Sequence, residues 1–287
     1  MTESQFNRDF AGKMYSGSPL DVTADSIRAY ALATNETNTR FTHSDSRQII
    51  APPFYTVVVL PDLLQQLWLD PDEIGADPSR VVHAQQEMRW FESVRPGDIV
   101  YSSAEIANIV SRGRHESLDM IVSLTREDTK LVDMTFRIIA LTKGGTSEKK
   151  ATPPKFEEIT RHLITEGTSV VSADQGKRYA KASGDLNPLH TDDEVGRRLG
   201  FPGAILHGLC TLAMSTQTIV DSVLDGDPTG LRFLSARFSN PVFMGETLTT
   251  RVYADAPTEE GFDSFRFLAV DSKDTPVVTD GIAHISG

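Results

Sequence analysis

The residues best suited to chemistry in this sequence lie in the run SGDLNPLH, where a carboxylate, Asp185, stands five residues before an imidazole, His190. Pro188 disfavours a helical backbone at Asn187, so we expect the run to form a turn. A turn can aim both side chains at one point, which a straight helix would not do. A carboxylate and an imidazole that converge on one water molecule can polarise it and transfer protons between that water and a neighbouring carbon.

The same residue types also have ordinary structural uses, and their spacing alone does not decide between the two interpretations. Asp185 can cap a turn, Asn187 can bond its own backbone, and His190 can be a loop histidine whose hydrogen bonds are satisfied. The next run, HTDDE, offers His190, Asp192 and Asp193 as metal ligands. That pattern is weak, and the acidic start of a solvated helix explains both aspartates, so we expect no metal site.

A second run, FPGAILHG, places a Pro-Gly pair ahead of an apolar segment that we expect to be a buried helix over residues 203–224. Free N–H groups and the positive end of the helix dipole gather at such a start, which suits developing negative charge. Gly208 is equally explained by a close approach of sheet and helix. We expect His207 to be a packed structural histidine and not a second base.

The elements that position these runs follow from periodicity and turn signals. In the first half we expect a helix that starts at Thr23, a polar loop, a buried helix interrupted by Pro61, and four antiparallel strands over 81–141. In the second half we expect a helix over 172–183, the polar loop, the buried helix, and four strands over 232–242, 247–256, 262–271 and 276–285. The same order of elements therefore occurs twice.

Matching residues support an internal duplication. Tyr30 matches Tyr179, which lies 149 residues farther on, and Arg89 matches Arg237, which lies 148 residues farther on. We expect a degenerate first half over residues 1–143, a linker over 144–160 rich in Gly, Ser, Lys and Pro, and a working second half over 161–287. At the position of His190 the first half has Phe41, so a reaction that needs this histidine is lost there.

Composition excludes several classes of function. The formal net charge of -12, with no Lys/Arg run, argues against a nucleic-acid partner. No apolar run approaches the ~20 residues that span a bilayer, and neither a signal peptide nor a peroxisomal ending is visible, so we expect no membrane association and a cytoplasmic location. The single cysteine, Cys210, excludes an internal disulfide and favours a reducing compartment.

The runs SGDLNPLH and GFPGAILHG strongly resemble those of the MaoC-like (R)-specific enoyl-CoA hydratases, also called hydratase 2. The specific match covers Tyr179 to Gly208, and the duplication resembles the double hot-dog members of that family across nearly the whole chain. The resemblance implies an α+β fold with two curved antiparallel sheets, each wrapped around a buried helix. The break at Pro61 and the loss of the histidine would make room in the first half for the acyl chain.

The resemblance also implies roles for particular residues. Asp185 and His190 would hold the catalytic water, Asn187 would shape their loop, and the Gly208 N–H would hold the thioester oxygen as it becomes enolate-like. A further hydroxyl on the buried helix would bind substrate near Ser215 or Thr216. The basic residues nearest the motif are candidates for binding the phosphates of CoA, although they equally suit a solvated face: Lys177, Arg178, Lys181, Arg197 and Arg198.

The implied reaction adds water reversibly across a trans-2-enoyl thioester to give the (R)-3-hydroxyacyl thioester, without a cofactor. The substrate would be an acyl-CoA or an acyl-carrier-protein thioester, and assembly into a homodimer stays open. Two other functions stay open in the same fold, a catalytically silent acyl-thioester-binding subunit and a thioesterase. The enzyme is favoured because a site that had lost its activity would resemble the first half, whereas the second half keeps Asp185, Asn187, His190 and Gly208.

Overall fold

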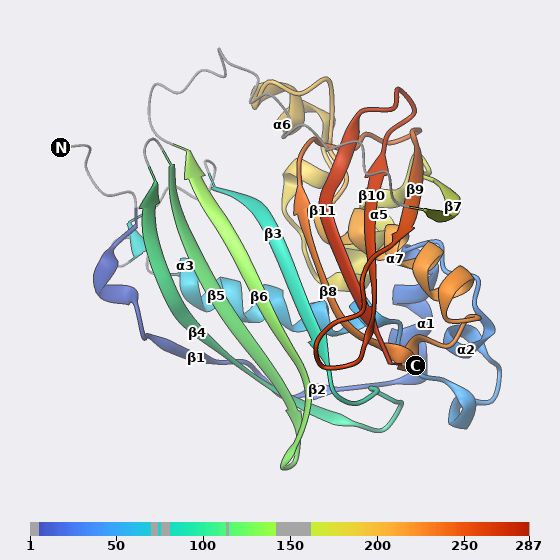
Figure 1. Cartoon of the computed structure of the whole chain (residues 1–287). Coiled ribbons are helices and arrows are strands. Elements are labelled where there is room, and N and C mark those ends of the chain that lie inside the picture. The colour runs from blue at the N-terminus through green and yellow to red at the C-terminus, as the bar shows by residue number, and fades with distance from the viewer. Residues whose placement is uncertain (1–5, 70–73, 76–80, 113–114, 142–161, 287) are drawn as a thin grey trace.

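A computed structural model describes residues 6–69, 74–75, 81–112, 115–141 and 162–286 (Figure 1). The expected linker over 144–160 lies outside these residues. The described strands form one antiparallel sheet in the order β1-β4-β5-β6-β3-β8-β11-β10-β9-β7, with β2 paired to β4. The strands are β1 (Met14–Ser16), β2 (Leu20–Asp21), β3 (Val81–Trp90), β4 (Ile99–Arg112), β5 (His115–Arg126), β6 (Thr129–Leu141), β7 (Leu163–Val170), β8 (Leu231–Phe238), β9 (Thr247–Ala254), β10 (Asp263–Val270) and β11 (Pro276–Ile285).

The sheet has two equivalent parts that meet at one seam. Strands β4, β5, β6 and β3 come from the first half, and β8, β11, β10 and β9 repeat that order in reverse from the second half. At the seam, β3 pairs antiparallel with β8, with Gln85 opposite Arg237 and Arg89 opposite Phe233. The two expected sheets are therefore present, and they are joined edge to edge.

Helices cover the inner face of the sheet, and Figure 1 shows α3 behind β4 to β6 and α7 behind the second-half strands. In the first half they are η1 (Arg8–Phe10), α1 (Ala24–Ala33), α2 (Thr39–Thr42), η2 (Ser46–Gln48), η3 (Pro53–Val59) and α3 (Leu60–Trp68). In the second half they are α5 (Gln175–Ser183), η5 (Pro188–His190), α6 (Asp193–Arg198), α7 (Gly208–Val223) and η6 (Pro228–Gly230). Among the described residues, none of these helices has both the length and the apolar character needed to cross a membrane.

The backbone repeats the duplication that the residues suggest. The amide of Ala51 donates to Val94, and in the second half the amide of Leu206 donates to Val242. Likewise, α1 and α5 pack together, and the hydroxyls of Tyr30 and Tyr179, 149 residues apart, lie 3.3 Å from each other. The two matched tyrosines therefore meet where the halves face one another.

The buried helix of the first half is broken, as the proline predicts. Residues 53–59 form the 3-10 helix η3, and α3 starts at Leu60 with Pro61 in its first turn. A Cβ on Gly184 would lie 3.5 Å from Pro61 Cγ, so the break runs beside the start of the Asp185 loop. Leu60 and Leu63 are buried there, and Pro53 and Thr56 of η3 line one of the two cavities described below. Room for an acyl chain in the first half stays a prediction.

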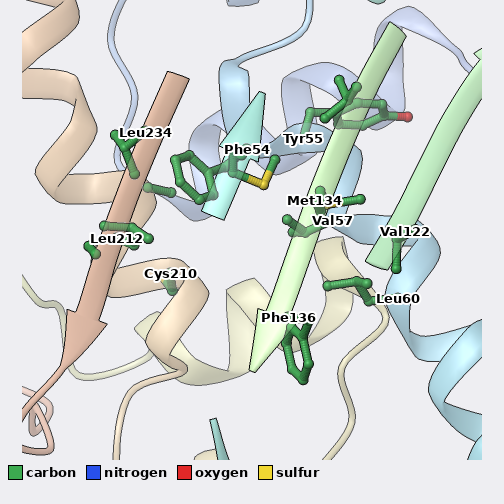
Figure 2. Close-up of a cluster of buried hydrophobic side chains, with 14 of the residues drawn as sticks. Phe54, Tyr55, Val57, Leu60, Val122, Met134, Phe136, Cys210, Leu212 and Leu234 are labelled. Atoms are coloured by element: carbon green, nitrogen blue, oxygen red, sulfur yellow. The ribbon is translucent and has the colours of Figure 1, made fainter. Parts of the chain in front are cut away.

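One hydrophobic core joins both halves. Figure 2 shows Phe54 of η3 and Met134 of β6 beside Leu212 of α7 and Leu234 of β8, with the side chains directed toward a shared interior. Such a continuous core fixes the position of each half against the other, because interiors pack at high density and transmit small displacements.

Three details differ from the expectations. The helix predicted from residue 203 begins only at Gly208, because Ile205 forms a β-bridge with Phe243 and Leu206 bonds to Val242. Strand β7 was missed, since its alternation carries few large apolar residues. The short strands β1 and β2 were also missed, since two or three residues give no period to detect.

Candidate active site

The Asp185 loop begins where α5 ends. Gly184 closes the helix in a left-handed conformation with φ of 80°, which a residue with a Cβ adopts only at a cost. Asp185 Oδ1 then accepts the amide of Asn187 at 3.2 Å, and Asn187 Oδ1 accepts the amide of Leu189 at 3.0 Å. The predicted turn is confirmed, and Asn187 shapes it as the cap of η5.

His190 stands at the end of this turn with one ring nitrogen fixed. Its Nδ1 lies 2.9 Å from the carbonyl oxygen of Ile205, which can only accept, so Nδ1 carries the proton and Nε2 offers a lone pair. Burial lowers the pKa of His190 from the usual 6.5, against the opposing effects of the Ile205 bond and the charge of Asp185. The imidazole is therefore neutral and basic at Nε2.

His207 packs directly against this pair. Its ring stacks on that of His190 at 4.0 Å between centroids, and its Nε2 donates to the backbone oxygen of Asp185 at 3.1 Å. Burial, and then the neighbouring His190, lower the pKa of His207 to about 3, so it stays neutral. The expectation of a packed histidine is confirmed, and its position holds both Asp185 and His190 in place.

The carboxylate and the two imidazoles form one compact group. The ligand atoms of Asp185, His190 and His207 all lie within 4.8 Å of one another. The side chain of Asp185 is 45% exposed, so water can reach the group. Of the residues that the HTDDE run offers as metal ligands, Asp192 caps α6 by accepting the amide of Glu194, and Asp193 accepts the amide of Ala204. Both aspartates therefore have structural roles at the start of α6.

Gly208 is the first residue of α7, where backbone amides lack partners within the helix. A Cβ on Gly208 would lie 3.2 Å from Cε1 of Phe238, which is tight. The ring of His83, from β3 of the first half, lies 4.7 Å from the Phe238 ring. The close approach of helix and sheet is confirmed, and a strand of the other half contributes to its surroundings.

Ser215 and Thr216, the hydroxyl residues expected to bind substrate, lie farther along α7 from the Asp185 loop than Gly208 does. The hydroxyls of Ser215 and Thr216 are buried and donate to Thr211 and Leu212 of their own helix. Ser215 is seven residues beyond Gly208, roughly 10 Å along the axis at 1.5 Å per residue. These bonds account for the two hydroxyls as members of the helix interior.

Arg197 and Arg198 lie exposed on α6, which packs against η5. Arg197 pairs with Asp193 at 3.7 Å, and Arg198 Nε donates to the Glu194 carbonyl at 3.4 Å. A cavity of about 410 Å³ opens beside His190, and Lys177 is the cation in its lining. The solvated-face interpretation thus fits the two arginines, and Lys177 is nearer to the site.

The first half repeats this geometry without its chemistry. Glu36 Oε1 accepts the amide of Asn38, as Asp185 does for Asn187, and Asn38 caps α2 as Asn187 caps η5. Phe41 follows in a buried cluster with Ala31 and Ile50. Burial raises the pKa of Glu36 to about 7.

The helix start of the first half also differs. Counting two residues from the equivalent bonds of Ala51 and Leu206 places Pro53 where the second half has Gly208. Proline has no N–H. The sequence comparison detected the loss of the histidine at Phe41 but missed this loss of the amide, because the loops between the two positions differ in length.

Comparisons with known proteins identify relatives of this chain. The family model described as "MaoC like domain" matches residues 155–267, and that described as "FAS1-like, dehydratase domain region" matches residues 9–130. The chain is 26% identical over 243 residues to the probable enoyl-CoA hydratase 2 of Dictyostelium discoideum, covering 83% of each chain. It is 28% identical over 262 residues to the 3-hydroxyacyl-thioester dehydratase Y of Mycobacterium tuberculosis, covering 87% of this chain and 86% of that one.

Solved structures show the same fold. The MaoC-like dehydratase from Phytophthora Capsici matches with a TM-score of 0.83 at 19% identity, over 98% of this chain and 97% of that one. A Mycobacterium tuberculosis protein described as having a double hotdog fold matches with a TM-score of 0.67 at 12% identity, over 98% of this chain and 97% of that one.

Proposed function

This chain belongs to the MaoC-like dehydratases of double hot-dog fold, and from that membership we propose that it reversibly hydrates trans-2-enoyl thioesters to 3-hydroxyacyl thioesters. One observation carries the proposal. The Asp185 carboxylate and the neutral His190 imidazole meet on one turn, in a group that water can reach. The relatives named enoyl-CoA hydratase and thioester dehydratase support this reaction class.

In the proposed mechanism, a water molecule lies between the Asp185 carboxylate and Nε2 of His190. His190 takes one proton from the water as the water oxygen forms a bond to C3 of the enoyl group. Asp185 accepts a hydrogen bond from the other O–H, which stays on the oxygen as the product hydroxyl, and so orients the water. The electron pair of the double bond moves toward the thioester oxygen, where the Gly208 amide stabilises the negative charge. C2 then takes the proton from His190, which restores the neutral imidazole.

The remaining parts of the proposal concern the substrate and the assembly. We propose the (R)-3-hydroxyacyl product, formed by addition to one face of the enoyl group held between the loop and α7. The carrier is CoA or an acyl-carrier protein, and pairing of two chains into a homodimer is compatible with the site because its groups come from one chain. We assign the degenerate half to residues 1–143 and the catalytic half to residues 161–287.

A coupled assay tests this function. A short enoyl-CoA is added to the purified protein, and the loss of the conjugated double bond is followed together with thiol release. We expect hydration without thiol release, and chiral analysis should show the (R) product. Thiol release alone would indicate a thioesterase, and neither signal across several chain lengths would indicate a silent binding subunit.

Matched variants test the residues. Asp185→Asn and His190→Ala should each remove most of the hydration while circular dichroism stays unchanged, because both side chains lie on the short segment between α5 and α6. The equivalent first-half change, Glu36→Gln, should leave hydration almost unchanged. Near-normal hydration in either second-half variant would refute the proposed pair, and a large loss in Glu36→Gln would show that the first half takes part.

A further inference from the structure

A second cavity, of about 310 Å³, lies at the opposite end of the seam from the Asp185 loop. Its lining includes Pro53 and Thr56 of η3, Trp90 of β3, and Leu231 and Arg232 at the start of β8. His83, which lies near Phe238 and Gly208, is seven residues from Trp90 on β3. At about 3.3 Å per residue, the cavity lies roughly 23 Å from that position along the strand.

This cavity occupies the place in the first half that corresponds to the surroundings of Gly208 in the second. Pro53 starts η3 as Gly208 starts α7. The Trp90 Nε1–H donates to the Pro53 carbonyl at 3.0 Å, and in the second half Phe238 lies against Gly208. In both halves the start of the helix therefore packs against an aromatic ring at the equivalent strand position, and in the first half a cavity opens beside that contact.

The first-half hollow lacks the groups that the hydration needs. Phe41 stands where the second half has His190, and Pro53 has no N–H to hold an oxyanion. Glu36 is buried with a pKa of about 7 and is not part of the cavity lining. The hollow therefore lacks both the histidine and the oxyanion donor of the second-half site.

The lining nevertheless carries groups that point to a ligand. Thr56 is buried, with 4% of its surface exposed, and its hydroxyl has no hydrogen-bond partner among the described residues. A buried polar group without a partner is costly, so a ligand atom that forms a hydrogen bond with it gains affinity. Two aromatic rings, Trp90 and Phe91, provide an apolar surface in the same lining.

Charge defines the ligand class. Arg95 and Arg232 both line the cavity, against the single carboxylate of Glu92, so the lining has a net positive charge. Arginine recognises phosphate and carboxylate through its planar set of donors. A ligand that satisfies the lining has an anionic group for the arginines, an acceptor or hydroxyl for Thr56, and an apolar part for the rings.

We propose that this cavity is a second, non-catalytic binding site for an anionic compound with an apolar part. Coenzyme A and a free short-chain carboxylic acid share this chemistry. The proposal goes beyond the proposed hydration, and only the choice of coenzyme A as a probe rests on it. A bound ligand would contact η3 of the first half and β8 of the second.

Tryptophan fluorescence tests the site directly, because the chain has two tryptophans and one of them lines the cavity. In the Trp68→Phe protein, Trp90 is the single reporter. Coenzyme A and butyrate are titrated separately, with hydration measured on the same preparation. We expect a saturable change with at least one probe. A response to coenzyme A alone identifies the coenzyme as the ligand, and a response to butyrate alone identifies the free acid.

Two variants and one control locate the response. Arg232→Gln should raise the apparent Kd about tenfold or more, the loss expected for one charge-assisted hydrogen bond. Thr56→Val should also weaken binding while raising the Tm of the unliganded protein, because it removes an unpartnered hydroxyl. Asp185→Asn should abolish hydration and leave the Trp90 titration unchanged. The proposal is overturned if neither probe changes the Trp90 fluorescence up to ~10 mM, or if neither cavity variant affects the response. If the Trp68→Phe protein still hydrates enoyl-CoA in that case, the proposed function stands without this second site.

Discussion

Gly208 starts a helix, where proline fits the backbone, so Gly208→Pro removes the amide and tests its oxyanion role. The preceding residue, His207, has φ of -55° and ψ of 133°, a conformation that a following proline favours. Proline is also common at the first position of a helix, since the amide there has no partner within the helix. The first half already has Pro53 at the equivalent helix start.

The size of the effect follows from the chemistry of the lost donor. Removing one oxyanion donor typically lowers turnover by about 10²–10³, or roughly 2.7–4 kcal/mol of transition-state stabilisation. Steric effects must be separated from this loss, because any Cβ at residue 208 approaches Phe238 Cε1 to 3.2 Å. Gly208→Ala adds the Cβ and keeps the amide, so it is the matched control.

The assay is hydration of a short enoyl-CoA by both variants, with Tm and circular dichroism as checks on folding. We expect Gly208→Ala to lose a modest part of its kcat, and Gly208→Pro to lose at least a further hundredfold at similar Tm. If a folded Gly208→Pro protein hydrates as fast as Gly208→Ala, the amide does not hold the oxyanion, and another donor must be sought.

Three further predictions concern pH and the loop. Because burial lowers the pKa of His190 from 6.5, kcat should stay level as the pH falls through 6.5, and a decline centred at that value would contradict the assignment. Burial raises the pKa of Glu36 from 4.5 to about 7, so Glu36 binds its proton more tightly in the folded state than in the unfolded state. Its contribution to the free energy of unfolding is therefore fully present below pH 4.5 and is lost as the pH rises to about 7. Denaturant titrations should show that Glu36→Gln removes most of this loss, at most about 3 kcal/mol, and an unchanged pH dependence would exclude Glu36 as its source. Gly184→Ala and Gly97→Ala place a Cβ at φ of 80° and 94°, and each should lower the free energy of unfolding by about 1–2 kcal/mol. Only Gly184→Ala should slow hydration, because it displaces Asp185. Equal hydration rates of the two variants would argue against a role for the Asp185 turn.

The sequence by itself determined the local features. Pro188 and Asn187 fix a turn through their own backbone preferences, so the Asp185 loop could be predicted from neighbouring residues. Pro61 similarly predicted the break in the first buried helix. The repeated residues indicated the duplication, because two copies of one ancestral pattern keep the same order of elements.

Only the tertiary structure decided which side chains meet. The stacking of His207 on His190 joins a helix start to a turn, and the approach of His83 to Phe238 joins strands from different halves. Periodicity cannot show such contacts, because they depend on how the seam and the shared core pack the elements together. The same packing directs the hydroxyls of Ser215 and Thr216 into their own helix and places Pro53 where the second half has Gly208. Local chemistry thus set the turn, and packing between distant segments set what surrounds it.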